Sequence, residues 1–390
     1  MTIQQNSQHQ FLLEPRFDYI YKRKLKARAT GPYTPKTDQE VTEGLHKLFA
    51  NMGLKDVVTK NVKRMAGGAS KEQFAFELSH ADMTTPQRYV LRMDPLEGIV
   101  ETCRLREAQL LTALRGILPV PAVLAVDADG EFLGRPGVIT EFVQGVTAPP
   151  AESGKGVSGI GITYGSYAAK LAPQFVRYMA ALHSWSDWQP EQLSTYFFPA
   201  KGTKEAPLYQ IDYWAKAWDI DFVEPVPMIT FATNWLRDNA PVCDDPCMLH
   251  CDYRIGNFLF DADSGKITSI LDWELSHVGD FHEDLAWSMH SFFGSKNEQG
   301  EFLVCCLLPR QEFISEYEKL SGRKVDLKTL NYYQVMNSWK CALMGWSSAI
   351  IAAQNGNNHQ DLLITWLGSA GGVHISQTIE LIREYEKNFS

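Results

Sequence analysis

Residues 249–260 read LHCDYRIGNFLF, and residues 270–274 read ILDWE. In the first stretch, Asp252 lies on a predicted loop, and Asn257 follows five residues later. Short apolar runs on both sides of a turn at 261–265 predict a β-hairpin. A hairpin returns the chain to the edge from which it left, so we expect Asp272 to lie beside Asn257.

This arrangement of side chains suits phosphoryl transfer. The reaction needs a carboxylate that accepts or orients the proton of the attacking hydroxyl, and it needs oxygen ligands for Mg²⁺. We therefore predict that Asp252 is the catalytic base and that Asn257 and Asp272 bind the metal. Arg254 is predicted to contact an anionic substrate or a phosphate, with a surface salt bridge as the alternative. His250 is predicted to orient the loop by hydrogen bonding.

Composition narrows the class of protein. The chain has 390 residues, a net charge of −9, 45% hydrophobic residues and 21% charged residues, which predict a folded globular protein. The acidic balance argues against nucleic-acid binding, because duplex affinity comes largely from Lys and Arg on phosphates. The polar first residues and the lack of a long apolar run predict a cytoplasmic protein without a membrane span. The oligomeric state stays open.

The seven cysteines are expected to be free thiols. Cys243, Cys247 and Cys251 are spaced by four residues, which suggests a metal site. That spacing is not a standard zinc pattern, and no matching ligand pair follows nearby. Structural thiols are therefore the favoured interpretation.

Hydrophobic periodicity divides the chain into three parts. Residues 1–38 are predicted to be a partly irregular leader, whose basic cluster between residues 22 and 28 is a solvated face, with phosphate or CoA contact as the alternative. Residues 39–143 begin with a helix and continue in the order β-β-β-α-β-β. Residues 144–390 start with a linker rich in Gly, Pro and Ser and are then mostly helical.

The segments HCDYRIGN (250–257) and ILDWELSHVGDFHEDLAW (270–287) resemble two motifs of the aminoglycoside phosphotransferase and choline kinase-like superfamily. The pattern is most similar to the kinase-like domain that is also fused to certain acyl-CoA dehydrogenases. The resemblance covers about residues 40–385. It implies a bilobal, protein-kinase-like α+β fold with a small antiparallel N-lobe, a larger helical C-lobe, and ATP and Mg²⁺ in the cleft between them.

The resemblance also implies nucleotide-binding residues in the N-lobe. The small-residue turn at 66–70 matches the turn that covers the phosphates, which assigns Gly67, Gly68 and Ser70 to this role; a plain hairpin turn is the alternative. Arg92 takes the position of a phosphate-binding lysine, and Glu107 on the next helix would pair with it. An exposed helix carboxylate is the alternative for Glu107.

Further positions follow from the same resemblance. Glu141 and Val143 match the hinge whose backbone binds adenine, although Phe142 and Val143 would equally fit ordinary strand core. Asp280 and Asp284 resemble an element that stabilises the catalytic segment. Cys251 replaces a glycine that is common at its position, which questions the backbone geometry there.

These features together predict an ATP-dependent phosphotransferase that acts on a hydroxyl of a small molecule. Abundant tryptophans in the C-terminal half favour an acceptor with an apolar portion, such as a hydroxyacyl or other lipophilic metabolite. The alternatives are an aminoglycoside-type antibiotic kinase and a nucleotide-binding pseudokinase or scaffold. A protein kinase is disfavoured, because GDFHEDLAW stands where an APE-like element would follow Asp272.

Overall fold

Alternating apolar side chains build a five-stranded antiparallel sheet at one end of the molecule. The computed structural model describes residues 12–65, 70–156 and 159–389. Every second side chain of the second strand is buried, as its QFAFEL pattern predicts. The spatial order of the sheet is β1 (Val58–Arg64), β2 (Glu72–Ser79), β3 (Gln87–Met93), β5 (Gly137–Glu141) and β4 (Val123–Asp127).

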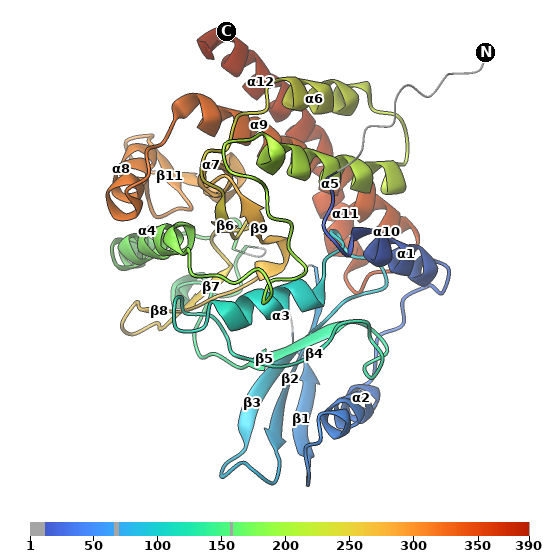
Figure 1. Ribbon diagram of the computed structural model, residues 1–390. Helices are drawn as coiled ribbons and strands as arrows, with labels where there is room; N and C mark the ends of the chain where they lie inside the picture. Colours follow the sequence, from blue (N-terminus) through green and yellow to red (C-terminus); the bar gives the residue numbers. More distant parts are fainter. Residues whose placement is uncertain (1–11, 66–69, 157–158, 390) are drawn as a thin grey trace, which may run out of the picture.

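Two helices complete this smaller lobe (Figure 1). Helix α2 (Asp38–Asn51) begins with a capping box formed by Thr37 and Glu40, and its Leu45 and Phe49 pack into the core of the sheet. Helix α3 (Arg104–Ala113) lies between the sheet and the larger lobe (Figure 1). The small lobe therefore has the predicted strand order with one helix inserted after β3.

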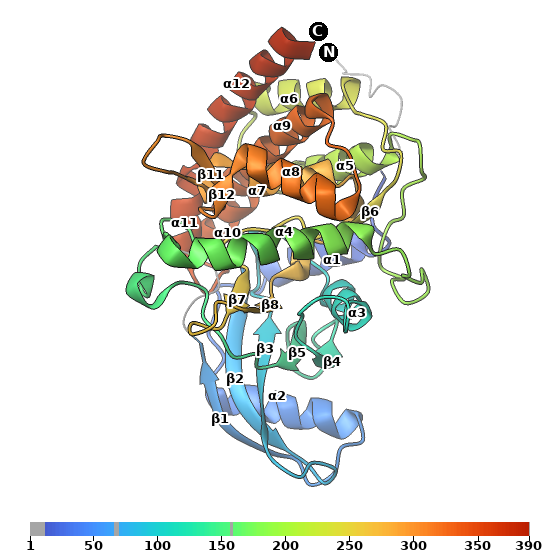
Figure 2. The ribbon, with the colours of Figure 1, turned by 90° about the vertical axis from the view of Figure 1, so that its left-hand side faces the viewer.

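The larger lobe is mostly helical. Figure 2 and the packing show α4 and α8 side by side, while α9 packs against both α7 and α12. The helices are α4 (Ala168–Ser184), α5 (Glu205–Asp221), α6 (Pro227–Asp238), α7 (His282–Ser288), α8 (Arg310–Ser321), α9 (Leu327–Met344), α10 (Ile350–Gln354), α11 (Asp361–Ser369) and α12 (Gly371–Phe389). Short helical turns are η1 (Pro150–Glu152), η2 (Gly165–Tyr167), η3 (Trp273–Leu275), η4 (Ser291–Phe293) and the π-helical η5 (Gly345–Ala349).

Short strands carry the two sequence motifs. The predicted hairpin is present, because β7 (Phe258–Phe260) pairs with β8 (Ile267–Ile270). A second antiparallel pair joins β6 (Cys247–Leu249) to β9 (His277–Gly279). A further small sheet, which the sequence did not predict, contains β10 (Ser295–Lys296), β11 (Phe302–Val304) and β12 (Leu308–Pro309).

The helical C-terminal segment is divided into α11 and α12. The division falls at small residues, and Gly371 lies so close to Trp346 that an added Cβ would be 2.4 Å from its ring. The close approach of this backbone to an aromatic ring therefore needs glycine.

The basic leader segment is only in part the solvated face that we expected, because Lys22 and Lys26 are exposed but Lys24 is buried. It forms α1 (Phe17–Arg28), in which Lys24 is buried in an ion pair with Asp221. Arg28 contacts both Glu97 and Asp221 at 2.6 and 2.8 Å. These cations thus bind carboxylates of the chain itself, and the expectation was wrong for Lys24.

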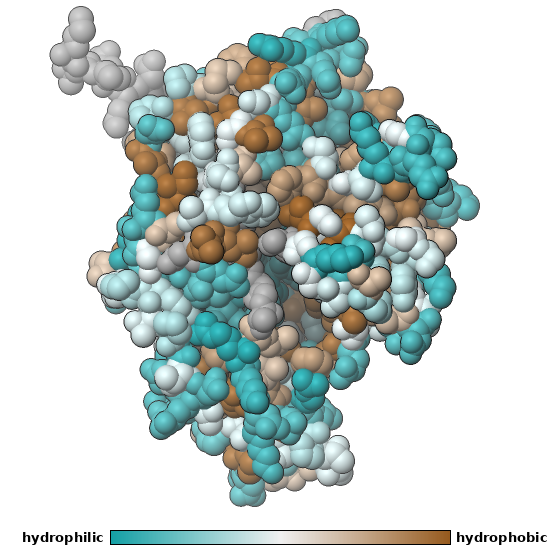
Figure 3. All heavy atoms as spheres, turned by 180° about the vertical axis from the view of Figure 1, so that it is seen from behind, coloured by the Kyte–Doolittle hydropathy of each residue, from teal (hydrophilic) through white to brown (hydrophobic). Residues whose placement is uncertain are grey.

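The face seen in Figure 3 is hollowed where the two lobes meet, and hydrophilic side chains dominate this face of the smaller lobe. None of the helices in the described part of the chain combines the length and the apolar content of a membrane span.

Candidate active site

A buried carboxylate of α7 holds the loop of residues 250–257. Asp284 accepts the backbone N–H groups of His250 and Cys251 at 2.8 and 2.6 Å, and His183 lies 3.1 Å from the same carboxylate. Cys251 has a φ of +61°, in the left-handed region that favours glycine. The two hydrogen bonds from Asp284 help to hold this backbone conformation. Asp280 accepts the N–H of His282 at 3.0 Å, within its own turn.

His250 ties this loop to the hairpin that follows. Its Nδ1 accepts the N–H of Asp252 at 3.1 Å, and its Nε2 lies 2.9 Å from the carbonyl oxygen of Leu271. The N–H of Leu271 donates to the carbonyl of Asn257 at 2.7 Å. These contacts position the residues before Asp272 against the 250–257 loop, which is the orienting geometry expected of His250.

Three side chains donate hydrogen bonds to Asp252. Its Oδ1 accepts Arg254 Nε at 2.7 Å and Trp287 Nε1 at 2.9 Å, and its Oδ2 accepts Asn257 Nδ2 at 2.6 Å. Burial, together with the charge of Asp272, raises the pKa of Asp252 despite the opposing guanidinium of Arg254. The structure therefore brings all the predicted catalytic residues together. Sequence reasoning gave no role to Trp287, although this tryptophan is the last residue of the quoted 270–287 motif.

Asp272 follows β8 with a left-handed φ of +66°. One of its carboxylate oxygens contacts the guanidinium of Arg92. The amide nitrogen of Asn257 is used by Asp252, and no described residue donates to the Oδ1 of Asn257. One carboxylate and one amide oxygen form a donor set that fits Mg²⁺, a cation that takes one or two carboxylates and keeps several waters.

Arg92 of β3 contacts one carboxylate in each lobe, Glu107 of α3 and Asp272 after β8. Its guanidinium lies 2.5 Å from Glu107 Oε1, so the ion pair inferred from the sequence is present. Burial disfavours the charge of Arg92, but Glu107, Asp272 and Glu274 outweigh burial and raise its pKa. Whether Arg92 binds a nucleotide stays a prediction.

The sequence analysis did not predict the network of buried charges that surrounds Arg92 and Glu107. Arg104 contacts Glu107 and lies 3.1 Å from Glu274 and 3.2 Å from Asp94. Lys71 lies 3.5 Å from Asp94 and 3.6 Å from Glu274. Burial opposes ionisation of Glu274, but Lys71, Arg104 and Arg92 lower its pKa. The only sequence signal was the position of Glu274, two residues after Asp272.

The predicted phosphate-covering turn can be followed only in part. Gly67 and Gly68 lie outside the described residues. Ser70 is described, and the hydrogen bond of its side chain helps to lower the pKa of Glu274. This serine therefore lies next to the charge network beneath the sheet.

The predicted hinge begins at Glu141, the last residue of β5. Glu141 is exposed, and its Oε1 accepts the N–H of Ala122 at 3.0 Å. The guanidinium of Arg88 lies 3.9 Å from the ring centre of Phe142. No described residue hydrogen-bonds to the backbone N–H or carbonyl of Val143, so these groups are available to a ligand edge.

The segment predicted as a linker also contacts the site. Gly159 has a φ of +85°, and an added Cβ would lie 2.7 Å from backbone atoms of Gly256 and Ile255. The glycine-rich segment thus packs directly on the 250–257 loop, a contact that composition alone could not predict.

Behind the loop lies a fully buried polar cluster. The sulfur of Cys251 lies 3.2 Å from His277 Nδ1, and His277 Nε2 lies 3.2 Å from Glu283. Lys340 forms an ion pair with the same Glu283. The pKa of Glu283 is lowered to about 2, because Lys340 and His277 outweigh the effect of burial. These contacts place Cys251 in a structural cluster.

The described part of the chain does not bring Cys243, Cys247 and Cys251 to a common metal site. A cavity of about 20 Å³ lies beside Cys251 and is lined by aromatic side chains, among them Tyr209, Trp214 and Trp287. Such a volume suits one water molecule, so this cavity is too small for an acceptor.

The chain matches the model of a known protein family. The model of the phosphotransferase enzyme family matches residues 61–304, which include the sheet from β1 onward, the 250–257 loop and Asp272.

The curated relatives are named as acyl-CoA dehydrogenase family proteins. The human acyl-CoA dehydrogenase family member 11 is 26% identical over 315 residues, which are 76% of this chain and 37% of that protein. The mouse acyl-CoA dehydrogenase family member 10 is 25% identical over 211 residues, which are 53% of this chain and 18% of that protein. The chain therefore spans well under half the length of these relatives.

Solved structures share the fold. A candidate aminoglycoside phosphotransferase from Ralstonia eutropha superposes with a TM-score of 0.63 at 21% identity, covering 88% of this chain and 98% of that chain. An ethanolamine kinase from Plasmodium vivax superposes with a TM-score of 0.58 at 12% identity, covering 96% of this chain and 100% of that chain. At these identities the likeness establishes the kinase-like α+β fold.

Proposed function

The chain belongs to the phosphotransferase enzyme family, and on that premise we propose that it transfers the γ-phosphoryl group of ATP to a hydroxyl group of a small molecule. The observation that carries this proposal is the convergence of Asp252, Asn257 and Asp272 at the end of one hairpin. Phosphoryl transfer depends mainly on positioning and electrostatic stabilisation, which such a convergence can supply.

Asp252 is the proposed base. Its carboxylate would accept or orient the proton of the acceptor hydroxyl, and its raised pKa supports this role, because a base works best when its pKa approaches the working pH. Arg254 and Trp287 hold one carboxylate oxygen and Asn257 holds the other, so the carboxylate is fixed in orientation.

Asn257 and Asp272 would hold Mg²⁺ through the amide and carboxylate oxygens described above. Bound there, Mg²⁺ supplies positive charge against the phosphate oxygens of ATP. Arg92, kept in place by Glu107, would contact the phosphates, which a guanidinium binds well. The backbone of Val143 is the proposed partner of the adenine edge.

A hydroxyacyl or other lipophilic molecule is the proposed acceptor class. The names of the curated relatives support it, because both are acyl-CoA dehydrogenase family proteins. This chain matches only 37% of the human protein, so the dehydrogenase activity itself is not part of the proposal.

The test is a screen for ATP-dependent phosphorylation, read as a mass shift, on a panel of hydroxyacyl compounds with aminoglycosides and amino alcohols as separate arms. Wild-type protein is compared with Asp252→Asn and with Asp263→Asn, a matched change at an exposed turn of the same hairpin. We expect phosphorylation of a hydroxyacyl compound by the wild type and by Asp263→Asn only. Phosphorylation confined to aminoglycosides would overturn the acceptor class, and MgATP binding without turnover on any arm would favour the pseudokinase.

A further inference from the structure

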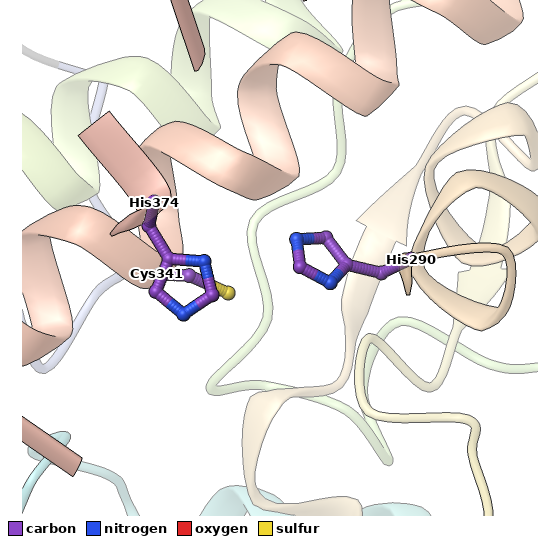
Figure 4. Close-up of side chains that lie close together, drawn as sticks. All are labelled: His290, Cys341 and His374. Carbon is purple, nitrogen blue, oxygen red and sulfur yellow. The ribbon is translucent and has the colours of Figure 1, made fainter. Parts of the chain in front are cut away.

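Three side chains that can bind metal converge in the larger lobe, and none of them is a proposed Mg²⁺ ligand. His290 lies just after α7, Cys341 lies on α9 and His374 lies on α12. Their potential ligand atoms all lie within 4.8 Å of one another. Figure 4 shows the three side chains pointing into one space.

The two histidines are buried and incompletely paired. His290 is 5% exposed and His374 is 7% exposed. In the described part of the chain, neither His290 Nε2 nor His374 Nδ1 has a hydrogen-bond partner, although both atoms are buried. Native proteins leave few buried polar atoms unsatisfied, so two such atoms at one place point to a missing ligand.

The backbone around the cluster is fixed by side chains one turn away. On α9, Asn337 donates to the carbonyl of Glu283 at 2.9 Å and Ser338 donates to the carbonyl of His374 at 3.1 Å. Gln377 donates to Ser291 Oγ at 3.3 Å, which ties α12 to the turn that follows His290. The three ligand-bearing segments are thus held together without a ligand.

We propose that His290, Cys341 and His374 form a binding site for Zn²⁺, with solvent as the fourth ligand. Two imidazole nitrogens and one thiolate without a carboxylate suit a borderline-soft cation and not Mg²⁺ or Ca²⁺. Cys341 is partly buried and both histidines are buried, so a single solvent molecule is the proposed fourth ligand. Three protein ligands and one open position are the arrangement of zinc sites that keep an exchangeable ligand.

Metal binding changes the positions of two protons, that of the Cys341 thiol and that of the His290 ring. The thiol of Cys341 releases its proton to solvent, and the resulting thiolate binds the cation. The Phe292 N–H donates to His290 Nδ1 at 3.2 Å, so the proton of this neutral ring is on Nε2. On binding, that proton moves to Nδ1 through solvent and the hydrogen bond from Phe292 is lost. One neutral hydrogen bond is a small loss beside the free energy of a zinc site with nitrogen and sulfur ligands.

The second Cys/His group in the described residues lacks these properties. Cys251, His277 and Glu283 lie close enough to share a metal, but the ammonium of Lys340 already pairs with Glu283. A resident cation at that position repels a metal ion, and the group satisfies its polar atoms internally.

The experiment measures zinc binding by the full chain without nucleotide or acceptor. Protein stripped with a chelator is titrated with Zn²⁺ in competition with a chromophoric chelator, and bound metal is counted by mass spectrometry. We expect one zinc per chain in the wild type and in the control Cys243→Ser, which removes a buried thiol elsewhere. Cys341→Ser and His290→Gln should weaken binding by at least about 100-fold. No stoichiometric zinc in the wild type, or equal affinity in Cys341→Ser, would overturn the proposal.

Cobalt provides a second readout that does not depend on the variants folding. Co²⁺ added to the wild-type protein should give tetrahedral visible bands and a thiolate charge-transfer band. Their absence would overturn the site even if Cys341→Ser failed to fold. Neither result bears on Asp252, so failure here leaves the proposed phosphotransferase chemistry to its own test.

Discussion

Replacing Glu283 with glutamine should destabilise the protein, because it removes a buried negative charge beside Lys340. The side chain of Glu283 is 2% exposed and that of Lys340 is 4% exposed. The other carboxylate oxygen of Glu283 lies 3.2 Å from His277. Glutamine keeps the shape of the side chain but leaves the buried ammonium of Lys340 without a counter-charge.

The size of the effect follows from two arguments. The pKa of Glu283 falls from 4.5 to about 2 on folding, which corresponds to about 3 kcal/mol of stability. Because the folded pKa is the lower one, this stability is complete above about pH 4.5 and is lost as the pH falls towards 2. Removing one partner of a buried ion pair costs about 3–5 kcal/mol in other proteins, which agrees with the value from the pKa of Glu283.

Calorimetry can measure this loss. A chain of this length has an unfolding entropy of about 0.8 kcal/mol/K, so the Tm of Glu283→Gln should fall by about 4–6 °C at pH 7. The difference from wild type should shrink as the pH is lowered from 4.5 towards 2. The control Glu316→Gln removes an exposed pair with Lys319 and should change stability by less than about 1 kcal/mol.

A double variant gives the sharpest check on the reasoning. Glu283→Gln combined with Lys340→Met removes both charges and should recover most of the lost stability, because the cost comes from the unpaired ammonium. A Tm change below about 1 °C in the single variant would refute the argument, as would a double variant as unstable as the two single changes added together.

Two further predictions concern the 250–257 loop. Asp284→Ala leaves the buried N–H groups of His250 and Cys251 unpaired, so it should cost about 2–5 kcal/mol in urea unfolding and abolish activity; unchanged stability would show that the loop holds itself. Gly159→Ala places a Cβ 2.7 Å from the backbone of Gly256 at a left-handed φ, so it should cost about 1–3 kcal/mol. A wild-type melting curve for this alanine variant would contradict the close packing.

Much of the fold followed from local pattern. The family, the kinase-like α+β fold and the phosphotransferase activity class that the sequence indicated are confirmed by the family match and the shared fold. The hairpin between Asn257 and Asp272 was predictable because apolar runs around a polar turn specify a two-stranded pairing. The pair between Arg92 and Glu107 could be inferred only through the resemblance, because the two residues lie on different elements.

The remaining features depend on contacts between distant segments. Lys71, Arg104 and Glu274 are ordinary charged residues in the sequence, and their burial becomes apparent only when the sheet and α3 pack against the start of the larger lobe. Lys24 looked solvated because its partner Asp221 lies 197 residues later. Local composition does not predict ion pairs between distant segments, because these pairs form only when folding buries both partners together.

The central claim is that Asp252 acts as the base in ATP-dependent phosphoryl transfer. With an acceptor identified by the screen, the most direct measurement compares kcat/KM of wild type and Asp252→Asn, with MgATP affinity followed by calorimetry. We predict a loss of about 100-fold or more in kcat/KM with MgATP affinity preserved, because the substitution removes the proton acceptor and keeps the shape of the site. Turnover by Asp252→Asn within about tenfold of wild type would contradict the account.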